Sequence, residues 1–235
     1  MASTFLDLTN QLLRRLNEVE IAESEFSSCR GVQALAKDAI KNSIAKINSA
    51  EFEWPFNATL HTQVITVGQE EYNWPTYFKS VDWNSFQLQE NASLGVGYTH
   101  LTLTSRDQYY KLGKDTDDAS GAAGIGVPTN IMPGHGNGFI MTPSPNQAYT
   151  VKYRYYINHA DLVNALDITR IPDTYDHIII DGALYQVYLF RDNAESAGLQ
   201  LQIFQQGIKE MQSILINKYE TIRDTRTVRI VRSYF

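Results

Sequence analysis

The chain lacks the cysteines that would allow a disulfide framework, because Cys29 is the only one among its 235 residues. A single thiol fits a reducing compartment or simple burial. No apolar run approaches the roughly 20 residues that a membrane-spanning helix needs. Residues 1–16 also lack the basic and continuous apolar regions of a signal peptide. We therefore expect no membrane partner and no Sec-dependent export.

An excess of basic residues is missing as well. The chain has 20 Lys and Arg against 26 Asp and Glu, a net charge of −6, so it has no general electrostatic footprint for nucleic acid. Hydrophobic residues make up 43% and charged residues 20%, which is ordinary for a globular protein. The length allows one large domain or two small ones.

Metal and cofactor motifs are absent too. None of the five histidines forms an H-x-H, H-E-x-x-H or cysteine-paired motif, so we expect no zinc site. Asp115, Asp117 and Asp118 lack the correctly placed glycine and glutamate of a calcium loop. They are more typical of a solvated acidic loop. We predict no bound metal and no cofactor.

Catalytic and phosphate-binding motifs are also missing from the sequence. A Gly-rich stretch near residues 113–138 contains two glycine clusters, neither in the dinucleotide-binding spacing nor followed by Lys-Ser/Thr. We expect a long loop there, and loops of that length are usually functional or mobile. There is no G-x-S-x-G motif, and Cys29 at a helix start is more typical of a small packed residue than of a nucleophile. We predict no catalytic residue, and nothing argues for an enzyme.

What the chain does have is a long helical region from Ile171 to Tyr219. It predicts two helices joined by a turn at Arg191-Asp192-Asn193, with Pro172 in the first helical turn. Asp192 and Glu195 resemble a capping box for the second helix. One apolar seam with spacing 4, 3, 4, 3, 4 runs along the second helix, formed by Ala197, Leu201, Phe204, Ile208, Met211 and Leu215.

The first of these two helices is apolar almost all round, which indicates burial on more than one side. Its apolar residues are Ile178, Ile179, Ile180, Ala183, Leu184, Val187, Leu189 and Phe190. Earlier in the chain, amphipathic helices are expected from about Thr4 to Leu16, with Thr4 and Asp7 as a start signal, and from about Ser28 to Ala50. The four helices should pack as one group.

Between the helical regions the hydrophobic period changes to two. Strands are expected at residues 60–67, 83–90 and 99–104, and a half-buried strand with one aromatic face at residues 149–158. Residues 105–112 could add a helical turn. The fold class is therefore α+β: a four-helix group built from the N- and C-terminal helices, an inserted antiparallel β-domain, and an extended C-terminal tail. We expect a discontinuous helical domain at residues 1–54 and 160–219, a β-domain at 55–159, and a docking tail at 220–235.

The tail combines basic and apolar residues. From Lys218 onward it has five basic residues and two acidic ones. One interpretation is a frayed, solvated terminus. The alternative is a docking arm, because apolar residues in a loose terminus have no core to enter and can be held by a partner chain, as in strand addition. The candidate partner-docking residues are Arg226, Val228, Arg229, Ile230, Arg232, Tyr234 and Phe235.

Several segments resemble one family. Three segments are similar to head-to-tail adaptor proteins of tailed bacteriophages, including the tail tubular protein A type. They are the opening TFLDLTNQLLRRLNEVEI, the segment PSPNQAYTVKYRYYINHADL, and the Ile171-Pro172 helical region, whose first helix ends in Arg-Asp. The resemblance covers about half the chain, at both ends, and leaves residues 54–137 unaligned.

This resemblance implies a ring of identical subunits, typically 12, that joins the portal protein to the tail tube or nozzle. DNA passes through the ring without specific binding, and the net negative charge agrees with that. The resemblance also implies a virion protein assembled in the host bacterial cytoplasm, with no catalytic residues.

Two alternatives stay open. One is another ring protein of the phage neck or tail, such as a head-closure or tail-terminator protein. The other is a binding module whose β-domain uses Trp74, Tyr77, Trp83 and Tyr98 to hold a glycan or peptide, although aromatic residues are more often part of a core.

Overall fold

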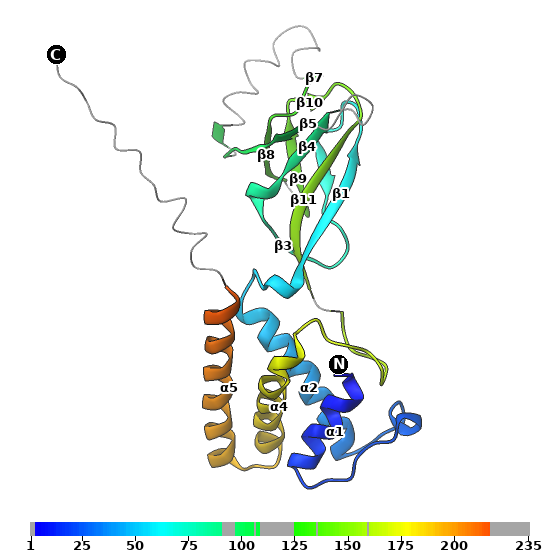
Figure 1. The fold of residues 1–235 in the computed structure, drawn as a ribbon, viewed down its shortest axis with the longest axis vertical. Coiled ribbons are helices and arrows are strands. Elements are labelled where there is room, and N and C mark those ends of the chain that lie inside the picture. The colour runs from blue at the N-terminus through cyan, green and yellow to red at the C-terminus, as the bar shows by residue number, and fades with distance from the viewer. Residues whose placement is uncertain are drawn as a thin grey trace, which may run out of the picture. The chain divides into compact units, whose positions relative to one another are not determined.

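A computed structural model describes residues 3–90, 97–105, 107–108, 125–134, 136–158 and 160–216. Their contacts divide them into two compact units, with the boundaries between Phe56 and Asn57 and after Asn158. One unit is helical and is built from both ends of the described chain (Figure 1). The other is formed by β-strands from the middle of the sequence. The fold is therefore mixed α+β, as expected.

The first helix, α1 (Phe5–Arg15), begins at a capping box. The Thr4 hydroxyl accepts a hydrogen bond from the Asp7 backbone N–H at 3.1 Å, and the Asp7 carboxylate accepts one from the Thr4 N–H at 3.0 Å. These bonds satisfy backbone donors that a helix start otherwise leaves unpaired. The start signal expected at Thr4 and Asp7 is confirmed.

The second helix, α2 (Val32–Ala50), begins later than expected. Gly31 precedes it with a φ of 61°, a left-handed conformation that glycine adopts easily. Upstream, Glu23–Glu25 form a short 3-10 turn. The predicted start at Ser28 was therefore too early. Trp54 follows the helix and is fully buried, with its indole N–H donating to the Ile47 carbonyl at 2.8 Å.

The two C-terminal helices are α4 (Asp176–Phe190) and α5 (Ala194–Leu215). Pro172 does not lie in the first turn of α4, because it has an extended conformation and precedes a 3-10 turn at Asp173–Tyr175. The turn at residues 191–193 is confirmed, but its cap is not Asp192. Asn193 accepts from the Ser196 N–H at 3.1 Å, whereas Asp192 has a φ of 56° and reverses the chain.

The core of the helical unit is centred on α4, which packs against α1, α2 and α5. This arrangement explains why α4 is apolar on several sides. The prediction was wrong for Leu189 and Phe190, which are exposed at the end of the helix. Along the predicted seam of α5, Ala197, Phe204 and Met211 are buried, and the remaining members are half-buried against the same core.

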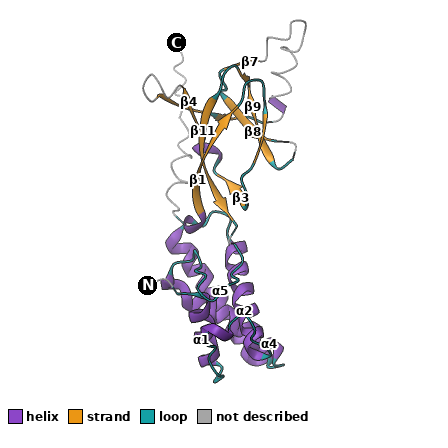
Figure 2. Cartoon of the chain, turned by 90° about the vertical axis from the view of Figure 1, so that its right-hand side faces the viewer, coloured by secondary structure: helices purple, strands orange, loops and turns teal. Residues whose placement is uncertain are grey.

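The β unit contains two larger sheets (Figure 2). The first has the order β1-β11-β4-β5, with β3 also pairing with β11. Its strands are β1 (Ala58–Ile65), β3 (Phe78–Val81), β4 (Gln87–Glu90), β5 (Gly97–His100) and β11 (Tyr149–Ile157). The second has the order β2-β9-β8-β6, formed by β2 (Glu71–Asn73), β6 (Thr102–Leu103), β8 (Asn130–Pro133) and β9 (Gly138–Thr142).

The central strand β11 shows the expected aromatic face. Tyr149, Val151, Tyr153 and Tyr155 are buried at alternating positions, as the period of two predicts. They share one core with residues of the second sheet; for example, the Phe86 ring lies 4.6 Å from Tyr153 and 5.3 Å from Phe139 between centroids. The aromatic side chains therefore hold the two sheets together.

Four expectations for the β unit need correction. Residues 99–104 are not one strand, because β5 ends at His100 and β6 belongs to the other sheet. Residues 113–138 are not one loop, because β7 (Ile125–Gly126) and β8 lie within them. Residues 83–90 are not one strand, since Trp83–Ser85 form a 3-10 turn before β4. The unit is also not wholly antiparallel: β6 pairs with β8, and β7 with β10 (Ser144–Pro145), in parallel. Most of residues 105–112 lie outside the described chain.

Candidate partner-binding surfaces

All seven predicted docking residues of the tail lie outside the described residues. These are Arg226, Val228, Arg229, Ile230, Arg232, Tyr234 and Phe235. The acidic residues Asp115, Asp117 and Asp118 lie outside them as well. In the described chain, three other surfaces are candidates for binding a partner or a segment of another copy.

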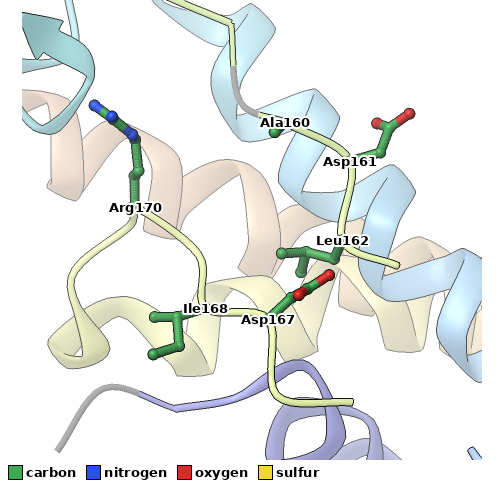
Figure 3. Close-up of a pocket in the computed structure, with 6 residues that line it drawn as sticks. All are labelled: Ala160, Asp161, Leu162, Asp167, Ile168 and Arg170. Carbon is green, nitrogen blue, oxygen red and sulfur yellow. The ribbon is translucent and has the colours of Figure 1, made fainter. Parts of the chain in front are cut away.

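The first surface is the segment Ala160–Arg170, which we call the acidic loop (Figure 3). It encloses a hollow of about 290 Å³ lined by Ala160, Asp161, Leu162, Asp167, Ile168 and Arg170. The carboxylates of Asp161 and Asp167 come from its two arms, and Arg170 points away from both (Figure 3). The sequence of this loop has no repeating hydrophobic pattern, so the loop was not predicted as a candidate surface.

Hydrogen bonds fix the shape of the acidic loop. Its carbonyl groups at Asp167 and Ala165 accept from the N–H groups of Phe5 at 2.8 Å and Leu6 at 3.0 Å. Both donors belong to the first turn of α1, where a helix leaves its N–H groups without internal partners. The loop therefore completes the start of α1, and α1 in turn holds the loop.

The Asp167 carboxylate forms a local turn. Its Oδ2 accepts from the backbone N–H groups of Val163 at 2.6 Å and Asn164 at 2.7 Å. Hydrogen bonds from the Asn164 and Val163 backbone hold the pKa of Asp167 below its usual value. The loop thus keeps a negative charge at neutral pH.

A second surface runs along α4 and α5. It is a groove of about 360 Å³ lined by His177, Ile178, Asp181, Leu199, Gln202, Ile203, Gln206, Gly207 and Glu210. Asp181 accepts from Arg15 at 2.7 Å and Glu210 accepts from Gln206 at 2.9 Å. Both carboxylates of this groove therefore already have partners within the chain.

A third surface is the outer face of β1, an edge strand of the first sheet. Leu60 and Val64 are exposed there, opposite Arg154 and Thr150 of β11. Long exposed edge strands can pair with other chains. The charged neighbours of this face on β11 are Lys152 and Arg154, both basic.

The four aromatic residues proposed for glycan or peptide binding differ in their exposure. Trp74 stacks on Phe78 at 4.5 Å between centroids and contacts Trp83 at 5.7 Å. Both tryptophans pack against the β core, whereas Tyr77 and Tyr98 are exposed. Trp74 and Trp83 are therefore half-buried packing residues, and of the four only Tyr77 and Tyr98 are exposed.

Packing explains the glycines at positions 126 and 138 of the Gly-rich stretch, whereas a Cβ added at Gly136 would meet no atom within 4 Å. A Cβ atom at Gly138 of β9 would collide with the backbone carbonyl of Tyr72 on the neighbouring β2, so glycine permits this pairing. A Cβ at Gly126 would lie 3.1 Å from Pro143. Neither position resembles a phosphate-binding loop.

His61 and Tyr153 of the β unit have shifted pKa values. Burial lowers the pKa of His61, which lies beside Tyr153, and burial raises the pKa of Tyr153. Among the described residues, no cluster of three or more His, Cys, Asp or Glu could hold a metal ion. No helix in the same part of the chain is both long and apolar enough to span a membrane.

Comparison with known proteins gives a match over nearly the whole chain. Residues 3–231 match the family model described as SU10 adaptor protein. In a comparison with curated proteins, none matches this chain. The family match includes residues 54–137, which the sequence resemblance had left unaligned. The chain belongs to the SU10 adaptor protein family, a family of phage structural proteins rather than enzymes, and the expected likeness to phage head-to-tail adaptors is confirmed.

Proposed function

We propose that copies of this chain form a closed ring, of 12 subunits, between the portal protein and the tail tube or nozzle of a phage. The observation that carries the proposal is the adaptor family match over residues 3–231. A subunit of such a ring must cover part of its surface with neighbours, and exposed apolar residues on the helical unit agree with this. They include Leu189, Phe190, Leu199, Ile203 and Ile214.

In this proposal the three parts of the chain have separate roles. The helical domain (residues 1–54 and 160–219) and the β-domain (55–159) form the body of the ring subunit, and the C-terminal segment (220–235) docks on a partner chain. The docking residues are the seven named above, from Arg226 to Phe235. Assembly takes place in the host cytoplasm before the particle is complete.

The charge of the chain suits a ring through which DNA passes. Described residues of the helical unit, 3–56 and 160–216, contain 16 acidic and 9 basic residues, a net charge of −7. Such a surface does not neutralise phosphates, so it gains little affinity from counterion release. DNA would then move through the ring without specific binding.

Electron microscopy and native mass spectrometry of the purified full chain, alone and with its portal protein, test this proposal. We expect a ring whose mass is an integral multiple of 26.7 kDa and which binds the portal. A chain that stays monomeric and does not bind the portal under any condition would contradict the proposal.

Another ring protein of the neck or tail, such as a head-closure or tail-terminator protein, is the alternative to exclude. Cross-linking in intact particles distinguishes the two, because an adaptor contacts the portal directly. Cross-links to tail proteins alone would favour the alternative.

A further inference from the structure

We infer that the acidic loop, Ala160–Arg170, is the receptor for the basic C-terminal segment Arg226–Phe235 of a neighbouring copy. This inference rests on the proposed ring and names the surface on which its docking tail binds. It is carried by the apolar exposure, the charge and the fixed shape of the loop, and by the composition of the tail.

Three apolar side chains of the loop are exposed close together. Val163 is 64% exposed, Leu166 62% and Ile168 54%, all within six residues. Single exposed apolar residues are common on protein surfaces, whereas a cluster of them marks a contact. The loop therefore offers the apolar part of a docking site.

Carboxylates accompany these apolar residues. Asp161 is exposed on one arm, and Asp167 on the other keeps its Oδ1 nearly free, with only a 3.4 Å bond from the Asn164 side chain. A carboxylate has room for about four hydrogen bonds. Guanidinium groups bind such oxygens through short, charge-assisted bonds. The loop thus suits a ligand that carries arginine beside apolar side chains.

The tail has this composition. Arg226, Arg229 and Arg232 alternate with apolar residues, namely Val228, Ile230, Val231, Tyr234 and Phe235. The segment from Lys218 onward has five basic and two acidic residues, a net charge of +3 against −7 for the described helical unit. Charge complementarity therefore directs the tail to the helical unit.

The shape of the loop is set before any ligand arrives. Its backbone bonds to Phe5 and Leu6 and its bridge between Thr4 and Ile168 fix it to α1, and Leu162 anchors it in the core. A site that is already ordered loses little conformational entropy on binding. The loop can therefore receive a flexible segment without refolding.

Chain direction favours a neighbour over the same copy. α5 packs on α4, while the loop is bonded to α1 on the opposite side of the helical unit (Figure 1). The 19 residues after Ile216 contain no Gly or Pro that would favour a tight reversal. Extended, they reach up to about 60 Å. In a head-to-tail ring, a segment of this length is long enough to reach the loop of the next copy.

The other two surfaces fit the tail less well. In the α4–α5 groove, Asp181 and Glu210 already bind Arg15 and Gln206. The outer face of β1 lies beside Lys152, which would repel a basic segment, and beside Arg154, whose charge is paired with Asp82 at 2.6 Å. The acidic loop is therefore the surface that matches the tail in both charge and apolarity.

Cross-linking between differently tagged full-length copies tests the inference. In a Cys29→Ser background, one copy carries Val163→Cys and the other Ile230→Cys, and the assembled mixture is treated with a short bismaleimide. The matched control replaces the loop thiol by Leu199→Cys on α5, where the exposure is similar, at 62%. We expect products between the two tags with Val163→Cys and few with Leu199→Cys.

The other outcomes each contradict the inference. Equal or stronger cross-linking at Leu199→Cys assigns the tail to the α4–α5 groove. In a variant that carries both Val163→Cys and Ile230→Cys in one chain, products within a single copy show that the tail returns to its own loop. A ring that forms without any product at Val163→Cys removes the loop as receptor but leaves the ring intact. If the chain never assembles, with or without the portal, the proposed ring is contradicted, and the inference that rests on it is contradicted as well.

A second measurement tests the charge. Asp161→Asn keeps the size of the side chain and removes its charge, and Glu195→Gln on α5 is the control. We expect Asp161→Asn to weaken assembly about tenfold, the loss of one charge-assisted bond, and Glu195→Gln to leave it unchanged. Equal effects of the two variants would contradict a contact between Asp161 and the arginines of the tail.

Discussion

Gly182 of α4 lies so close to Phe204 of α5 that a Cβ atom added at Gly182 would be 2.6 Å from the Phe204 ring. The same atom would also collide with the hydroxyl of Ser43 on α2. Three helices therefore meet at a position that only glycine allows. The close packing of α4 between α2 and α5 depends on it.

Gly182→Ala should therefore destabilise the helical unit, by about 1–3 kcal/mol, because the methyl group forces the helices apart. Gly198→Ala is the control, since no atom lies within 4 Å of its added Cβ on α5. That control should gain up to about 1 kcal/mol from helix propensity. Urea unfolding of the two variants measures both effects, and equal stability of the two would contradict the close approach.

In the β unit, Trp74→Ala should cost about 3 kcal/mol. Trp74 contacts Phe78, Trp83, Phe86, Phe139 and Tyr153, so its removal leaves a cavity between the sheets. Tyr98→Ala, at an exposed position on β5, should change the free energy of unfolding by less than about 0.5 kcal/mol. Near-ultraviolet circular dichroism and thermal unfolding check the pair. A Trp74→Ala variant as stable as Tyr98→Ala would show that Trp74 is not part of the core.

At the start of α1, Thr4→Ala should destabilise the chain by about 1 kcal/mol at neutral pH. Hydrogen bonds from Thr4, first from its side chain and then from its backbone, lower the pKa of Asp7. A lowered pKa in the folded state gives stability that is present above the unfolded pKa, near 3.9, and is lost as the pH falls through the folded pKa. The difference between Thr4→Ala and the unmodified chain should therefore shrink in acid.

Unfolding free energies between about pH 2 and pH 7 check the Thr4→Ala prediction. A difference that stays constant or grows as the pH falls would show that Asp7 does not take part in the cap.

Deleting residues 225–235 should leave thermal stability unchanged and weaken assembly. The described helical core ends before this segment, at Leu215 and Ile216, so the deletion removes none of its buried residues. Differential scanning calorimetry and analytical ultracentrifugation of the full and shortened chains measure the two effects separately. If the shortened chain unfolds, the tail belongs to the core and the docking role is wrong.

The sequence predicted those elements whose pattern repeats along the chain. The spacing of Phe204 and Met211 places α5 against α4, and the alternation through Tyr149 and Tyr153 places β11 in the sheet. Such periods are repeated over many residues, so single exceptions do not hide them.

Details that depend on one residue or on distant partners were not predictable in this way. Asp192 and Asn193 are both good cap residues, and the choice between them depends on which one reverses the chain. The short strand β8 has no pattern of its own, because it is defined by pairing with β9. Leu189 and Phe190 continue an apolar helix, yet they extend past the elements that would cover them.

The acidic loop escaped prediction for a similar reason. Asp161, Val163 and Ile168 have neither helical nor strand periodicity, so they resemble an ordinary connection. The loop is held in place by hydrogen bonds from the N–H groups of Phe5 and Leu6, which lie about 160 residues earlier in the chain. Only the folded unit brings these segments together.

Reconstruction of the intact phage particle by electron cryo-microscopy tests the central claim most directly. We predict a ring of this chain that contacts the portal on one side and the tail on the other, with DNA passing through its centre. A particle in which the chain lies elsewhere, or contacts no portal subunit, would contradict the account.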